Sequence, residues 1–308
     1  MDWRFVALPL LLVACAPDTD GDGLTNRQEE ELSLNPENPD TDEDGLADGA
    51  EVDEHGTDPL DADTDDDRQP DGMEIELGTD PFEVDTDGDG YLDGDEVNEE
   101  SDPTDASDVI YQGGWPYNGA RDEIGGGNRT TYETGRRLID AGTFRDQFRD
   151  QVSLYDFYNE QGIPVIIDVS ARWCPPCQAA AVWLDGDRDH AIWGGDTAYY
   201  DQLEADYAPV REAIHNGDLY WVTIIGEGMS GGTPAENSDA AAWYNDFPTE
   251  GVPVLADRNY TMSTFVQLRG WPTHMGLTPD LRVVEVEAGL EAGFQIAMEL
   301  LSASDVAE

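Results

Sequence analysis

The chain has 308 residues and a formal net charge of -54, from 69 acidic residues and 15 basic residues that are all arginine. This composition argues against nucleic acid as a partner, because phosphate binding needs clustered positive charge. Bound cations are the natural counterpart of so many carboxylates. Residues 16–108 hold 37 acidic residues and two arginines. Only the remainder of the chain, which is rich in aromatic and β-branched residues, can bury a sizeable core.

Residues 1–14 are typical of a secretory signal peptide, since the apolar run from Phe5 to Val13 is too short to span a bilayer. The segment Leu12-Val13-Ala14-Cys15 resembles the lipobox of bacterial lipoproteins. The resemblance implies that Cys15 is lipidated and anchors the mature chain in the bacterial cell envelope. Ala16 in place of a retention aspartate favours the outer membrane. The alternative is an ordinary signal peptide.

Four acidic segments repeat in register over residues 15–108, with starts 22, 23 and 22 residues apart. Each has Asp at positions 1, 3 and 5 and Glu at position 12, and three have Gly at position 6. Calcium takes six to eight oxygen ligands, and such a loop turns alternate carboxylates inward while the Glu closes the site. The predicted calcium ligands are Asp18, Asp20, Asp22, Glu29, Asp40, Asp42, Asp44, Glu51, Asp63, Asp65, Asp67, Glu74, Asp85, Asp87, Asp89 and Glu96.

These segments resemble thrombospondin type 3 repeats, as found in calcium-binding stalks of exported bacterial proteins. The resemblance implies an irregular calcium-bound stalk with little regular structure. Arg68 stands in the third loop where the others have Gly. Because a side chain resists a left-handed backbone, we expect this loop to bind most weakly or to be incomplete. The alternative for the whole region is a disordered acidic linker.

Residues 109–142 are predicted to be a linker or entry segment, followed by an α/β domain at residues 143–308. The expected order begins with a hairpin over 143–157, a buried strand over 163–169, a helix over 178–184, a helix over 199–215 and a strand over 219–225. It continues with a short helix over 238–245, strands over 252–256, 274–278 and 281–287, and a final helix over 290–301.

Cys174 and Cys177 flank two prolines where the buried strand gives way to a helix. A thiolate at a helix N-terminus is stabilised by backbone N–H groups and by the helix dipole. Cys174, at the exposed end, is expected to attack a substrate disulfide, and Cys177 to resolve the mixed disulfide. A zinc site is disfavoured because it needs four ligands. Acylation of Cys15 would leave these two cysteines as a pair.

The stretch Asp168-Val-Ser-Ala-Arg-Trp-Cys-Pro-Pro-Cys177 resembles the active site of thioredoxins, especially TlpA-like disulfide reductases. The resemblance runs over about 160 residues and implies a thioredoxin fold. It implies that Asp168 is a buried acid that moves the proton of the resolving thiol. It also implies that Pro272 is a cis proline facing the cysteines. The residues expected to contact substrate are Trp173, Trp271 and Thr273.

The sequence therefore predicts an envelope thiol–disulfide oxidoreductase that reduces disulfides in exported proteins and receives electrons from a membrane or periplasmic donor. Its redox site needs no cofactor beyond the Cys174–Cys177 disulfide. Two prolines between the cysteines remove N–H donors from the thiolate, which favours a reductase over a strong oxidant. One alternative is an oxidase or isomerase on the same fold. Another is a calcium-dependent surface or adhesion protein with a vestigial redox site.

Overall fold

The computed structural model describes residues 17–126, 129–187 and 197–304. The chain divides after Val109 into two compact units. The predicted lipidation residue, Cys15, lies outside the described residues. Within the described ranges, no helix has both the length and the apolar character needed to cross a bilayer.

The N-terminal unit consists of loops that each lead into a short helix. The helices are α1 (Asn26–Leu32), α2 (Asp48–Ala50) continuing as a π-helix (Glu51–His55), α3 (Asp71–Leu77) and α4 (Asp93–Glu99). Helices this short are unstable alone, so contacts of the neighbouring loops must support them. The prediction of an irregular region with little regular structure is confirmed, with these helical pieces added.

The C-terminal unit contains a seven-stranded sheet in the order β2-β1-β5-β4-β3-β6-β7. The strands are β1 (Thr143–Arg145), β2 (Gln151–Ser153), β3 (Val165–Ala171), β4 (Tyr220–Glu227), β5 (Val254–Ala256), β6 (Thr273–Leu277) and β7 (Val283–Ala288). The helices are η2 (Arg121–Glu123), η3 (Leu154–Phe157), α5 (Pro175–Asp185), α6 (Ala198–Asn216), α7 (Asn237–Asp246), α8 (Thr261–Phe265) and α9 (Ala292–Ser304).

The connectivity identifies the fold. Strand β3 continues through α5 and α6 into β4, which lies parallel to it. On the other side β3 pairs antiparallel with β6, and β6 forms a hairpin with β7 before the final helix α9. A parallel βαβ unit joined to an antiparallel ββα unit around a central strand is the thioredoxin fold. The predicted α/β thioredoxin fold is therefore confirmed.

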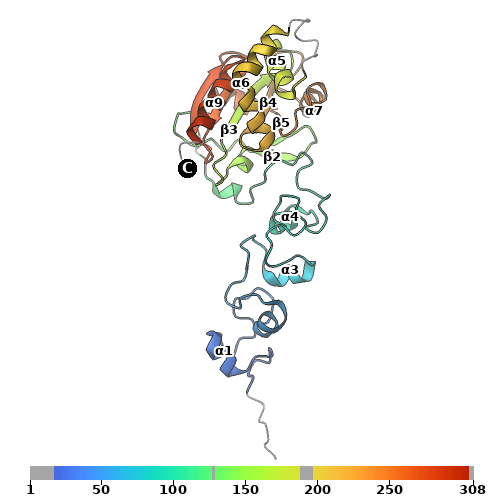
Figure 1. Ribbon diagram of the computed structural model, residues 1–308, viewed down its shortest axis with the longest axis vertical. Helices are drawn as coiled ribbons and strands as arrows, with labels where there is room; N and C mark the ends of the chain where they lie inside the picture. The colour runs from blue at the N-terminus through green and yellow to red at the C-terminus, as the bar shows by residue number, and fades with distance from the viewer. Residues whose placement is uncertain (1–16, 127–128, 188–196, 305–308) are drawn as a thin grey trace, which may run out of the picture. The chain divides into compact units, whose positions relative to one another are not determined.

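The core lies between the sheet and its helices (Figure 1). Trp183 of α5, Trp221 of β4 and Phe294 of α9 are almost completely buried in one apolar cluster. The ring of Phe294 lies 4.6 Å from that of Trp183 and 5.5 Å from that of Trp221. A second cluster contains both Cys174 and Cys177 with residues of α5, α7 and β5. The helices of the C-terminal unit are thus fixed by aromatic packing near the sheet centre.

Residues 110–142, predicted to be a linker or entry segment, cluster with the C-terminal unit. Tyr111 is buried, and its hydroxyl donates to Asp156 Oδ2 at 2.9 Å. Arg121 Nη1 donates to Asp156 Oδ1 at 3.1 Å. Trp115 is also buried, and its Nε1 donates to Asp146 Oδ2 at 2.8 Å. The aromatic residues in this Gly-rich segment hold it against the hairpin.

The predicted strands and helices of the C-terminal unit all occur, with small changes at their ends. For example, β3 spans residues 165–171 in place of 163–169, and α5 begins at Pro175 in place of residue 178. Proline at the first position of a helix loses no hydrogen bond, which explains the earlier start. The short helix α8 was not predicted, because its five residues carry no clear period.

Replacing Asp156 by Ala is expected to lower the free energy of unfolding by about 3 kcal/mol, because it leaves the partly buried Arg121 without its carboxylate. Urea denaturation followed by tryptophan fluorescence measures this. Glu160→Ala, at an exposed position nearby, is the control and is expected to change stability by less than about 0.5 kcal/mol. Equal stability of the two variants would show that residues 110–142 do not support the fold.

Candidate functional site

The two cysteines lie where the buried strand β3 leads into α5. All seven residues of β3 are buried, and Cys174 N donates to the carbonyl oxygen of Ala171 at the end of that strand, at 3.1 Å. Cys174 is the N-cap of α5, and Pro175 is its first residue. The backbone N–H of Cys177 donates to Cys174 Sγ at 3.2 Å. The sulfur of Cys174 therefore meets the N-terminus of a helix, as predicted.

Cys174 and Cys177 form a disulfide, with their Cα atoms 5.3 Å apart. Cys174 is only 2% exposed and Cys177 is fully buried. Our expectation that Cys174 lies at an exposed end is therefore corrected. Both cysteines belong to an apolar cluster with residues of α5, α7 and β5, and Tyr244 and Trp271 pack against this cluster.

Two tryptophans flank the disulfide. Trp173 is 40% exposed, and its Nε1 donates to Glu227 Oε2 at 2.8 Å. Its ring meets that of Trp271 edge to face, at 6.3 Å between centroids. The Trp271–Pro272 peptide bond is cis, as the thioredoxin resemblance implies. Thr273 is buried, and its hydroxyl donates to the carbonyl oxygen of Gly270 at 2.7 Å, so this side chain serves the loop itself.

Asp168 is a buried carboxyl group on β3, six residues before Cys174. Ser170 Oγ donates to its Oδ1 at 2.8 Å, and Thr223 Oγ1 donates to its Oδ2 at 3.4 Å. Burial nevertheless raises the pKa of Asp168 to about 7. A carboxyl group that titrates near neutrality can both accept and return a proton, which suits the predicted role.

Sequence reasoning missed His274, which lies on β6 opposite Asp168 in the strand register. Its Nε2 atom is 3.4 Å from Asp168 Oδ1, and both side chains are buried. The available signal was a histidine inside the strand Thr273–Leu277, where apolar residues are expected. Glu227, which orients Trp173, was also missed, because only the folded sheet brings the end of β4 next to the cysteine loop.

The acidic loops bring their carboxylates together as predicted. In the described residues, one oxygen from each Asp at positions 1, 3 and 5 lies within 4.8 Å of the others in loops that include Asp18/Asp20/Asp22, Asp40/Asp42/Asp44 and Asp63/Asp65/Asp67. In the loops starting at Asp40 and Asp85, the backbone N–H at position 6 donates back to the first Asp, at 3.2 and 2.9 Å. These turns direct the carboxylates inward.

Several of these carboxylates fit a hard cation. Both oxygens of Glu29 and of Glu96 are buried without a hydrogen-bond partner, and the same holds for Asp20. Burial and neighbouring carboxylates raise the pKa of Glu51 and of Glu74 to about 8. Buried carboxylates without donors are costly unless a metal ion binds them. An all-oxygen set of this kind matches the preference of calcium.

Position 9 of the loops carries acidic residues that the sequence reasoning missed. One oxygen of Asp48 lies within 4.8 Å of oxygens from Asp22 and Glu29 of the preceding repeat. Gly49 N, next to Asp48, donates to Asp22 Oδ2 at 3.0 Å, and a Cβ on Gly49 would lie 2.3 Å from the Asp22 carbonyl oxygen. The signal was an Asp-Gly pair that recurs at positions 9 and 10, as Asp48, Asp71 and Asp93.

The third loop keeps the geometry of the others despite Arg68. This residue has a φ of 81°, in the left-handed region, and its N–H donates to Asp63 Oδ2 at 2.9 Å. Its guanidinium forms an ion pair with Asp95 of the next repeat, at 2.5 Å. A side chain in the left-handed region costs about 1 kcal/mol of backbone strain. That this loop binds calcium most weakly stays a prediction.

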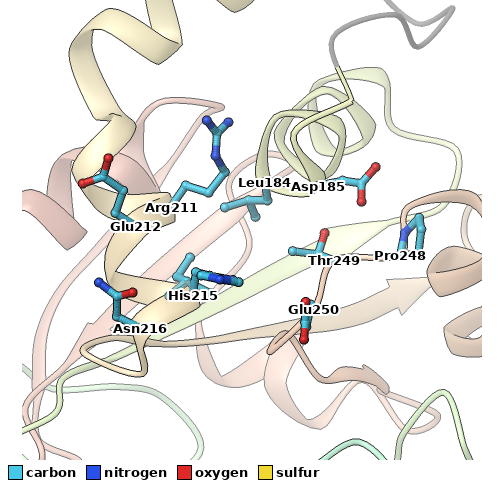
Figure 2. A pocket seen from close by; sticks show the side chains of 10 residues that line it. Leu184, Asp185, Arg211, Glu212, His215, Asn216, Pro248, Thr249 and Glu250 are labelled. Carbon is cyan, nitrogen blue, oxygen red and sulfur yellow. The ribbon is translucent and has the colours of Figure 1, made fainter.

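A pocket of about 670 Å³ lies at the far end of α5 from the cysteines. Figure 2 shows Asp185 at that end of the helix, Arg211 and His215 on α6, and residues 248–250 on a loop. Since α5 has 11 residues and a helix rises about 1.5 Å per residue, the pocket is about 15 Å from Cys174. We therefore do not include it in the redox site.

Comparison with known protein families supports the assignment of the N-terminal repeats. Residues 18–32, 40–62 and 85–106 match the family model of the bacterial TSP3 repeat. These ranges leave out residues 63–84, which contain the loop with Arg68. Among curated proteins, no similar sequence was found.

Solved structures similar to the chain include a candidate thiol:disulfide interchange protein DsbE from Chlorobium tepidum, at 19% identity and a TM-score of 0.38, covering 56% of this chain and 99% of that one. Peroxidoxin BcpB from Mycobacterium tuberculosis has 19% identity and a TM-score of 0.37, covering 57% and 99%. The exposed lipoprotein thioredoxin Etrx1 from Streptococcus pneumoniae has 19% identity and a TM-score of 0.36, covering 52% and 97%. Because these TM-scores are low, the fold assignment rests on the strand order of this chain.

Replacing Glu29 by Gln is expected to weaken calcium binding by about tenfold or more, because it removes a charged ligand from a buried oxygen cluster. Isothermal titration calorimetry on the full chain measures the affinity and the number of ions. Glu30→Gln removes the same charge from an exposed position on the same helix and is expected to bind as the wild type does. Equal affinities in the two variants would exclude Glu29 as a ligand.

Proposed function

We propose that the C-terminal unit is a thiol–disulfide oxidoreductase of the cell envelope that reduces disulfides in exported proteins. The observation that carries the proposal is the Cys174–Cys177 disulfide at the N-terminus of α5. Asp168, on the strand that leads to the pair, offers a proton acceptor whose pKa burial raises to about 7. The exposed Trp173 beside the disulfide offers an apolar surface to a substrate polypeptide.

The proposed reaction has two exchange steps. The Cys174 thiolate attacks one sulfur of a substrate disulfide, forms a mixed disulfide and releases the other substrate sulfur as a thiolate. Cys177 gives its proton to the Asp168 carboxylate and attacks Cys174 Sγ, so that the Cys174–Cys177 bond forms and the second substrate sulfur leaves. The substrate gains two electrons. A dithiol donor in the membrane or the periplasm then reduces the pair again.

The reductive direction follows from the donors around Cys174. Pro175 and Pro176 have no N–H, and the N–H of Cys177 donates to the sulfur. Fewer donors stabilise the thiolate less, which makes the reduced pair a better electron source. An oxidase or isomerase on the same fold is the alternative within this class. The intact disulfide and the buried Asp168 argue against a calcium-dependent adhesion protein with a vestigial redox site.

We further propose that the N-terminal unit is a calcium-binding spacer between a lipidated Cys15 and the oxidoreductase. Three observations support this proposal. They are the order of the segments along the chain, the match to TSP3 repeats, and the buried carboxylates that lack hydrogen-bond donors. Calcium at these carboxylates would offset their repulsion and stiffen the loops. Extracellular and periplasmic calcium suits the proposed location in the bacterial envelope, with the outer membrane favoured.

Replacing Cys174 by Ala is expected to abolish the reduction of insulin disulfides, because the attacking sulfur is lost. Turbidity from precipitating insulin chains, with dithiothreitol as the electron source, measures the rate. The soluble chain with Cys15→Ala is the matched control and is expected to keep the wild-type rate. Equal rates for Cys174→Ala and wild type would favour the adhesion alternative.

The same Cys15→Ala variant, expressed with its signal sequence in a bacterial host, is expected to leave the membrane fraction. The reason is that lipid chains attached to this residue are the proposed anchor. Fractionation followed by immunoblotting measures the distribution, and Cys177→Ala serves as the cysteine control that stays with membranes. Recovery of Cys15→Ala in the membrane fraction would exclude lipidation as the means of attachment.

A further inference from the structure

His274 occupies a place that otherwise takes an apolar side chain. It is fully buried on β6, and in the described part of the chain neither ring nitrogen has a hydrogen-bond partner. Its ring lies 5.7 Å from that of Trp221, and a Cβ added to Gly293 of α9 would lie 2.4 Å from its Cδ2 atom. Burying an imidazole costs free energy unless its nitrogens find partners. The presence of a histidine at this buried position therefore indicates that one of its ring nitrogens has a function.

The strand register places the carboxyl group of Asp168 opposite His274. Thr223, Asp168 and His274 lie directly opposite one another across β4, β3 and β6. Asp168 Oδ1 accepts a hydrogen bond from Ser170 and lies 3.4 Å from His274 Nε2. Asp168 Oδ2 accepts a hydrogen bond from Thr223. The carboxyl group thus has two hydroxyl donors and a hydrogen bond with the side chain of Trp221, and His274 Nε2 is the remaining nitrogen close to it.

We propose that His274 is a positioning residue for the redox reaction, whose Nε2–H holds Asp168 as the carboxylate that takes the proton of Cys177. This inference rests on the proposed oxidoreductase function of the cysteine pair. A hydrogen bond donated to the charged form of a carboxyl group favours that form. His274 therefore counteracts the burial that raises the pKa of Asp168, and keeps the base available at neutral pH.

The surroundings of the ring favour a neutral donor. Burial lowers the pKa of His274 to about 3, so the ring carries one proton, which can be on Nε2. On β7, Glu287 lies opposite His274 in the register and is exposed. Ahead of α9, Glu291 accepts hydrogen bonds from Tyr199 and Tyr207, at 2.7 and 3.3 Å. Trp221, Thr223 and Gly293, on the other packed elements, carry no charge.

The reaction of the reduced full chain with the aromatic disulfide dithiobis(nitrobenzoate) isolates the step in question. Cys174 attacks the reagent and releases one coloured thiolate. Cys177 then loses its proton to Asp168 and attacks Cys174 Sγ, which forms the internal disulfide and releases the second thiolate. Stopped-flow absorbance therefore gives the two steps as two phases, each with its own pH profile. No protein substrate is needed, so the result does not depend on which proteins the chain reduces.

In His274→Leu, the midpoint of the second phase is expected to move to higher pH by about one unit, which slows that phase about tenfold on the acid side. The first phase is expected to stay unchanged. His274→Gln, whose amide can donate to Asp168, is expected to restore the midpoint. An unchanged midpoint in His274→Leu, or equal slowing of both phases, would overturn the proposal. Absence of a second phase in the wild type would instead contradict the oxidoreductase function.

If His274→Leu does not fold, a measurement on the wild-type chain still tests the proposal. NMR of protein with isotope-labelled histidine reports which ring nitrogen carries the proton. The proposal predicts that at neutral pH His274 is neutral with its proton on Nε2. Asp168→Asn identifies the signal, because it changes the group that faces this nitrogen. A proton on Nδ1 in the wild type would overturn the proposal.

Discussion

Strand β3 is the element on which the C-terminal unit depends. It is buried along its whole length and is paired with β4 on one side and β6 on the other. A shift by one residue would turn its side chains to the opposite face of the sheet, so the pairing fixes both the side of Asp168 and the point where the chain leaves the sheet. That point brings Cys174 to the first turn of α5. The chemistry of the cysteines is therefore set by a strand that contains neither of them.

The N-terminal unit is organised by charge. Within its described residues, the large buried apolar side chains are Leu24, Leu34 and Tyr91, whereas many carboxylates are buried. A segment with so little apolar burial gains little from the hydrophobic effect. Carboxylates without donors, such as Glu29, repel one another until a cation binds. We therefore propose that calcium binding and folding of this unit are coupled, whereas the C-terminal unit folds around aromatic packing.

The sequence predicts most of the architecture because its patterns are local. Apolar runs rich in β-branched residues locate the strands, and the spacing of Asp and Glu locates the loops. Three features could be recognised only in the folded structure. The burial of Tyr111 and Trp115 became visible only against the hairpin, so their segment was interpreted as a linker or entry segment. The pairing of His274 with Asp168 depends on register between strands more than 100 residues apart. The low exposure of Cys174 depends on an apolar cluster that includes residues of the distant elements α7 and β5.

We propose that Cys174 and Cys177 form a working redox pair that acts as a reductant. Equilibration of the full chain with dithiothreitol buffers, followed by tryptophan fluorescence, gives the reduction potential of this pair directly. We expect a reduction potential closer to that of thioredoxin, about -270 mV, than to that of the strong oxidant DsbA, about -120 mV. A value near that of DsbA would contradict the reductive role. A pair that cannot be reduced by these buffers would contradict the redox function itself.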